Sequence, residues 1–136
     1  MLRNVGAIVA GLVVGMVVNL AIVQVNTAFF PLPEGVDLTD TNAMRDAVQA
    51  LPAASWILVF VAHIGQAFVG GWVAARLSVS ELLRNALIVG ILSMAAGIAN
   101  AVMLSAPAWT WIEMPFYPAA AWVAGRMAIS QRQGTA

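Results

Sequence analysis

The sequence predicts an all-α polytopic membrane protein with four transmembrane helices, arranged as two tandem parallel two-helix repeats. Three observations predict this class. The first is composition: hydrophobic residues make up 62% of the 136 residues and charged residues 9%, whereas an ordinary soluble domain has roughly 25% charged residues. A soluble domain of this size leaves too much surface exposed to hide so much apolar area, and the mean hydropathy is +0.90.

The second observation is a series of four apolar stretches, separated by short segments that contain polar residues or proline. Each is long enough to cross about 30 Å of hydrocarbon at 1.5 Å per residue. We expect the first stretch to remain as a mature helix, because its apolar core is longer than that of a signal peptide. The stretches are residues 5–30, 53–77, 82–104 and 109–129.

The third observation is an internal repeat. Two motifs occur twice in the same order: Leu-Arg-Asn at 2–4 and 83–85, and Trp-Val-Ala-x-Arg at 72–76 and 122–126. A unit of two spans returns the chain to its starting side, so both copies have the same orientation, related by an axis along the membrane normal. The shared spacing of two rare residue types favours duplication, and chance similarity between alanine-rich helices is the alternative.

The repeat divides a single transmembrane domain, residues 1–136, into two units. They occupy residues 1–80 and 82–130, and a flexible tail is expected at 131–136. The first unit is longer because it carries an inserted acidic connection at 31–52.

A short amphipathic helix is expected within that connection. Asp40 or Thr41 suits the N-cap position, and apolar residues follow at helical spacing until Pro52 interrupts the pattern. A solvated linker is the alternative. The apolar residues are Met44, Ala47, Val48 and Leu51.

Charge placement predicts the orientation. In the 31–52 connection acidic residues outnumber the one basic residue, Arg45. By the positive-inside rule both termini are therefore cytoplasmic, in a bacterial inner (plasma) membrane, and the connection lies outside. We expect Arg76 and Arg126 to be anchors at the cytoplasmic interface. The basic residues on that side are Arg3, Arg76, Arg84, Arg126 and Arg132.

Each predicted helix has one face of small or polar residues, as helix association in lipid requires. The remaining faces carry large apolar side chains suited to contact with lipid. We expect the glycines on the small faces to mark helix contacts, and a lined pathway is the alternative. These glycines are Gly11, Gly15, Gly70, Gly71, Gly97 and Gly125.

Two asparagines lie near the middle of their spans. Asn19 and Asn100 are equivalent under the repeat, each fifteen residues beyond the Leu-Arg-Asn motif. An amide at that depth needs hydrogen-bond partners. The pair is predicted either to hold helices together or to flank the repeat axis, where the two amides could coordinate a small ion or water.

His63 and Glu113 are the sharpest candidates for a polar or ion site. The second motif places them at equivalent positions, and ionisable residues within a membrane indicate function by default. Pro115 and Pro118 predict a kink or break, and irregular backbone at that depth favours a polar vestibule near Glu113 and Tyr117. In the alternative, Glu113 emerges at the outer interface and His63 bonds to a backbone carbonyl.

Several function classes are excluded by what the chain lacks. No Cys means no disulfide and no thiolate catalysis, and the formal net charge of +0 leaves no basic face for nucleic acid. The chain has one His and contains no zinc-protease, phosphate-loop or dinucleotide motif. We therefore predict no catalytic residues, no metal and no cofactor.

Three function classes remain. The pattern favours a channel-like or transporter-like protein of the lipid bilayer with a polar site between helices, homo-oligomeric because four short helices enclose little volume. The first alternative is an accessory or assembly subunit that packs its small-residue faces against a larger membrane complex. The second is a membrane-embedded enzyme that uses His63 and Glu113.

Overall fold

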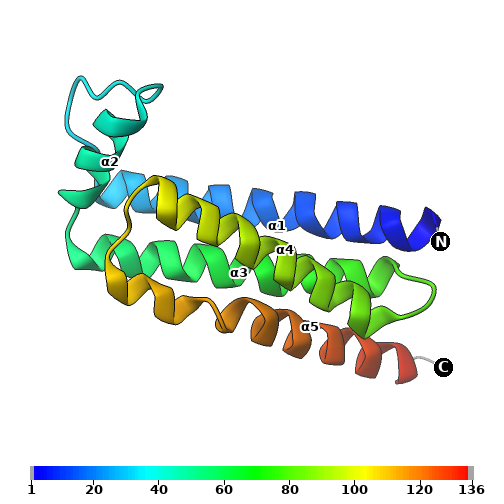
Figure 1. Ribbon diagram of the computed structural model, residues 1–136. Helices are drawn as coiled ribbons and strands as arrows, with labels where there is room; N and C mark the ends of the chain where they lie inside the picture. The colour runs from blue at the N-terminus through cyan, green and yellow to red at the C-terminus, as the bar shows by residue number, and fades with distance from the viewer. Residues whose placement is uncertain (1, 135–136) are drawn as a thin grey trace.

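The protein is a bundle of four long helices with one short helix beyond one end (Figure 1). The computed structural model describes residues 2–134. The long helices alternate in direction, so both termini lie at the same end of the bundle. The elements are α1 (Leu2–Phe29), α2 (Thr41–Gln49), α3 (Ala53–Leu77), α4 (Leu82–Met103), the 3₁₀ helix η1 (Ala108–Glu113) and α5 (Phe116–Gln133).

The end that holds both termini is called here the arginine end, because Arg3, Arg76, Arg84 and Arg132 lie in the first or last turn of their helices there and Arg126 lies in the second half of α5. The opposite end, which holds the 31–52 connection, is called the loop end. Within that connection Asp37 accepts hydrogen bonds from the hydroxyl group (2.6 Å) and the backbone N–H (2.9 Å) of Thr39. These bonds lower the pKa of Asp37, so the loop end keeps its negative charge.

Three helices, α1, α3 and α4, are long and apolar enough to cross a membrane. The distribution of side chains agrees with that environment. The fully buried positions are mostly alanine, whereas large apolar residues such as Val9, Val13 and Val17 of α1 are more than half exposed. A core of small residues inside a large apolar surface is the pattern that helices adopt in lipid.

The last predicted span, at 109–129, is not one continuous helix. The chain forms η1, breaks at Met114 and Pro115, and resumes as the 18-residue helix α5. A helix starts readily beside proline, because the N–H groups of its first turn have no helical partner in any case. The expected break is therefore confirmed. α5 is not among the three helices that meet the length and hydropathy of a span within residues 2–134.

The C-terminal tail is shorter than expected. Residues 131–133, which we assigned to the flexible tail at 131–136, continue α5 for most of another turn. Residues 135–136 lie outside the described residues.

The expected short helix in the connection is confirmed as α2. Asp40 is its N-cap, and the Asp40 carboxylate accepts a hydrogen bond from the backbone N–H of Asn42 at 2.8 Å. Two side chains of α2 reach the far end of α4. Arg45 donates to the carbonyl of Met103 at 3.0 Å, and Gln49 donates to the carbonyl of Ser105 at 3.2 Å.

Helix α3 is the centre of the bundle and packs against α1, α4 and α5. Two neighbouring glycines bring different helices to backbone contact. A Cβ atom on Gly70 would lie 2.7 Å from the carbonyl oxygen of Gly11 in α1, and one on Gly71 would lie 3.1 Å from Ala121 in α5. Each of the other glycines predicted at contacts also faces a neighbouring helix: Gly15 faces Gln66, Gly97 faces Tyr117, and Gly125 faces Ala86.

Side-chain hydrogen bonds close the arginine end. The Asn4 amide donates to the Ser80 hydroxyl at 2.9 Å and accepts from the backbone N–H of Val79 at 3.1 Å. The Asn85 amide donates to the Ser78 hydroxyl at 2.8 Å and to the carbonyl of Ser80 at 3.1 Å. The two asparagines of the repeated Leu-Arg-Asn motif thus hold the same short connection between α3 and α4.

The contact between Gly11 and Gly70 generates a stability prediction. In Gly11→Ala the new Cβ atom would lie 2.5 Å from the Gly70 carbonyl oxygen, so α1 and α3 must separate. We expect the free energy of unfolding in detergent micelles, measured with denaturant, to fall by about 1 to 3 kcal/mol.

Gly6→Ala is the matched control, because a Cβ atom at Gly6 would meet nothing within 4 Å. Alanine is the better helix former, so this variant should unfold at the same or a slightly higher denaturant concentration. Equal effects of the two substitutions would contradict the close crossing.

Candidate functional site

His63 of α3 and Glu113 of η1 are in direct contact inside the bundle. The His63 Nδ1 atom lies 3.0 Å from the Glu113 Oε1 atom, and the exposed fractions of the two side chains are 14% and 7%. Residues separated by fifty positions meet because the chain breaks at Pro115, so that η1 lies against α3 with the Glu113 side chain turned inward. Glu113 therefore has a side-chain partner inside the bundle.

Tyr117 completes this cluster from the first turn of α5. The Tyr117 hydroxyl group lies 3.4 Å from the Glu113 Oε1 atom, a long hydrogen bond. The Tyr117 ring stacks on the His63 imidazole with 5.8 Å between ring centroids, and Tyr117 is 1% exposed. A carboxylate is thus placed between a histidine and a phenol, away from bulk water.

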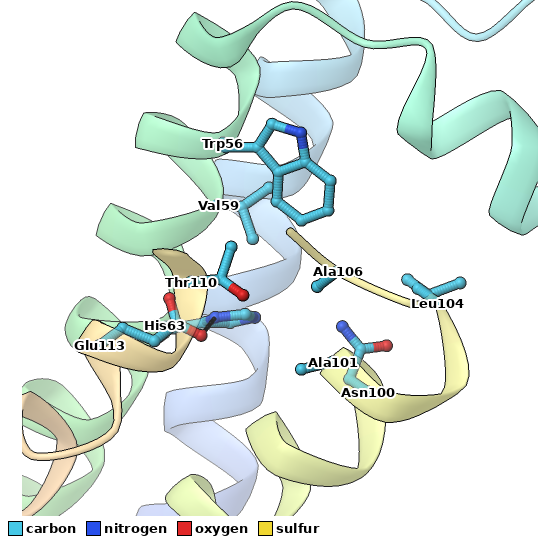
Figure 2. Close-up of a pocket in the computed structure, with 9 residues that line it drawn as sticks. All are labelled: Trp56, Val59, His63, Asn100, Ala101, Leu104, Ala106, Thr110 and Glu113. Carbon is cyan, nitrogen blue, oxygen red and sulfur yellow. Dashed lines mark hydrogen bonds and ion pairs between the residues drawn. The ribbon is translucent and has the colours of Figure 1, made fainter. Parts of the chain in front are cut away.

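A small pocket adjoins the cluster (Figure 2). The side chains of His63 and Glu113 point toward one another on one side of it, and Asn100 of α4 lies on the other side. The pocket has a cavity volume of about 20 Å³. This is enough for about one water molecule.

Two larger cavities meet at the same residues. The first, called here the central cavity, lies between α1, α3 and α4 and has a volume of about 300 Å³. The second, the loop-side cavity, lies beneath α2 and has a volume of about 320 Å³. Asn19, His63 and Asn100 line both cavities, so the structure brings together the predicted asparagines and the predicted histidine.

The two predicted asparagines do not hold helices together by side-chain hydrogen bonds. Within residues 2–134 neither the Asn19 amide nor the Asn100 amide has a hydrogen-bond partner, although both side chains are partly buried. An amide at this depth in a membrane is costly unless water or a bound molecule satisfies it. The two amides are therefore available to a ligand in the cavities.

Three polar residues that were not predicted lie at or beside these cavities: Asn26, Ser55 and Gln66. The Gln66 amide donates to the Ser93 hydroxyl at 3.4 Å in the wall of the central cavity. The Asn26 amide donates to the Ser55 hydroxyl at 2.9 Å, and Asn26 lines the loop-side cavity. Helical spacing offers a signal, since Gln66 follows His63 by one turn and Asn26 follows Asn19 by two turns on the same face.

The two arginines predicted as anchors pack on tryptophans one turn earlier in the same helix. The Arg76 guanidinium lies 5.4 Å from the centroid of the Trp72 ring, and that of Arg126 lies 5.8 Å from the Trp122 ring. These are cation–π distances. Within residues 2–134 no group of three or more His, Asp or Glu side chains is placed to hold a metal ion.

Comparison of the chain with known protein families, with curated proteins and with solved structures finds no match. The function must therefore be argued from the geometry.

Burial of the His63–Glu113 pair predicts strong energetic coupling. Removing either partner leaves the other buried and unpaired, so His63→Ala and Glu113→Ala should each destabilise the protein while the double variant costs less than their sum. We expect a coupling free energy of about 1 to 3 kcal/mol from denaturant unfolding in micelles.

The exposed pair Glu81 and Arg84 provides the matched control. Its atoms lie 3.7 Å apart, with side-chain exposures of 55% and 64%. The same double-mutant cycle there should give less than about 1 kcal/mol. Additive effects at His63 and Glu113 would show that the buried contact carries no stabilisation.

Proposed function

We propose that the protein is a small integral membrane protein, channel-like or transporter-like, whose central cavity binds a small polar solute or a cation. The observation that carries this proposal is the pair of partly buried amides, Asn19 and Asn100, which line the same cavity as His63 and have no side-chain partner within residues 2–134. Polar groups at membrane depth are expensive to keep unsatisfied and are retained where they contact water, an ion or a substrate.

In this proposal η1 and α5 together make the fourth span. α5 packs against both α3 and α4, and at 1.5 Å per residue its 18 residues extend about 27 Å. Burial of Tyr117, Ala121 and Ala124 against the other helices supports a position within the bundle, not on its surface. The two arginines of α5 then lie toward the interface.

Two contacts support the proposed repeat, because each joins residues at equivalent positions of the two units. His63 touches Glu113, and Gly71 faces Ala121, in both cases across an offset of fifty positions. Contacts of this kind arise where a pseudo-twofold axis passes between two parallel helices. The correspondence is confined to α3 and α5, because α4 packs against both of these helices whereas α1 packs mainly against α3.

We propose that the loop end faces outward and the arginine end faces the cytoplasm, following the positive-inside rule. Because the chain contains no Cys, single cysteines give a direct test. Asp37→Cys should react with a membrane-impermeant maleimide in intact cells, and Ser130→Cys should react only after permeabilisation. The reverse pattern would reverse the orientation.

Access to the central cavity comes from the loop end in this proposal. The cavity joins the loop-side cavity at His63 and Asn100. Toward the arginine end, the Gly11–Gly70 crossing and the bonds of Asn4 and Asn85 leave the helices in close contact. Passage through the membrane therefore requires a second conformation or a second copy of the chain.

Flux through proteoliposomes tests the proposal. We expect the protein to raise the flux of at least one of Na⁺, K⁺, H⁺ and glycerol above that of empty liposomes. Asn100→Leu keeps the side-chain size but removes the amide, so it should lower that flux about tenfold. The loss of one or two hydrogen bonds to the solute accounts for a factor of this size.

Asn42→Leu is the control, since Asn42 is exposed on α2 and its side chain lies outside both cavities. This variant should leave the flux unchanged. If the wild-type protein moves none of the four solutes and co-purifies with another membrane protein, the channel-like or transporter-like proposal is wrong and the accessory-subunit alternative replaces it.

A further inference from the structure

The loop-side cavity differs chemically from the central cavity. Ten of its fifteen lining residues are apolar, and no Arg, Lys, Asp or Glu side chain lines it. The apolar face of α2 forms one wall through Met44, Val48 and Leu51. A volume of about 320 Å³ lies within the range of cavities that bind small organic molecules, and mostly apolar walls with a few polar groups are typical of such sites.

Besides the amides of Asn19 and Asn100, one further polar group among the residues that line this cavity has no partner within residues 2–134. Asn26 is 5% exposed, and its Nδ2 atom donates to the Ser55 hydroxyl at 2.9 Å. Its Oδ1 atom is fully buried and accepts no hydrogen bond from the described residues. Buried amide oxygens are almost always hydrogen-bonded, so an unpaired one on a residue that lines a cavity indicates a missing donor.

We propose that the loop-side cavity binds an uncharged, largely apolar molecule that carries a hydroxyl group. No Arg, Lys, Asp or Glu side chain lines the cavity, so a charged molecule would find no opposite charge in the walls to offset its loss of hydration. The Asn26 Oδ1 atom needs a donor, and a hydroxyl both donates and accepts, so it would also satisfy the amide nitrogen if the amide turned over. The loop-side cavity shares Asn19, His63 and Asn100 with the central cavity, but this proposal depends on Asn26, which does not line the central cavity.

Trp56 provides a local probe, because it lines the cavity and is 8% exposed. The protein in lipid nanodiscs is titrated with bromodecanol, whose bromine quenches indole fluorescence on contact. The chain has five tryptophans, so the quenching that is lost in the Trp56→Phe variant is the signal that comes from the cavity. We expect this part to saturate at one bromodecanol per protein, whereas bromodecane, which has no hydroxyl, should bind about tenfold more weakly.

A second titration distinguishes a ligand that enters from the bilayer from one that enters from water. Bromobenzyl alcohol dissolves in water, whereas bromodecanol partitions into the bilayer. Saturable quenching by bromodecanol alone indicates a lipid-derived ligand, and saturable quenching by both indicates that soluble alcohols also enter. Either result supports the cavity as a hydroxyl-selective site.

Two variants keep the test decisive. Asn26→Leu combined with Ser55→Ala removes both partners of the hydrogen bond, so no orphaned group is left to unfold the protein. It should weaken bromodecanol binding about tenfold and leave bromodecane unchanged. Val23→Phe fills the cavity and should abolish the saturable quenching, whereas Val13→Phe, on the exposed face of the same helix, should not.

Three results would overturn the proposal. They are quenching that rises without saturation, equal affinity for bromodecanol and bromodecane, and unchanged bromodecanol affinity in the Asn26→Leu, Ser55→Ala variant. None of them decides the transport proposal, because the titration measures binding without flux and Asn26, Ser55 and Val23 do not line the central cavity.

Discussion

The two adjacent glycines of α3 are the constraint on which the rest of the structure depends. Successive residues of a helix point about 100° apart, so Gly70 meets α1 and Gly71 meets α5 at nearly the same depth. Because three helices come to close contact at one level, α4 must take the remaining side of α3. It packs closely against α3 and α5 and only over a shorter stretch against α1. The cavities follow from that unequal packing.

Within this arrangement the two ionisable side chains are hydrogen-bonded to each other, whereas two amide side chains have no partner. His63 and Glu113 satisfy one another at 3.0 Å, so the cost of placing charge in a membrane is reduced by a direct partner. Asn19 and Asn100 face the space between α1 and α4 and have no such partner within residues 2–134. The contact between His63 and Glu113 thus has a structural explanation of its own, whereas the Asn19 and Asn100 amides have none within residues 2–134.

The helices could be predicted from the sequence because apolar length and proline fix them locally. Residues 53–77 were predicted to the residue, and Asp40 was one of the two predicted caps, with Thr41, from its position before an apolar repeat. A shared pocket for His63 and Glu113 was predicted from the proposed repeat, and the two side chains are in contact. The cavities could not be predicted, since they depend on how α1 and α4 share the surface of α3. The unpaired Oδ1 atom of Asn26 was not predicted for the same reason, because a pattern of residues does not show which side-chain atoms lack a partner.

The two ends of the bundle differ in how firmly they are closed. At the arginine end, Asn4 and Asn85 bind the connection between α3 and α4 by four hydrogen bonds, one of them between buried side chains. At the loop end, two exposed hydrogen bonds to backbone carbonyls attach α2 to the end of α4. Exposed bonds exchange readily with water, so they contribute less than buried ones. The attachment of α2 to α4 is therefore weaker than the closure of the arginine end, and the proposed entry of a molecule past α2 is consistent with this difference.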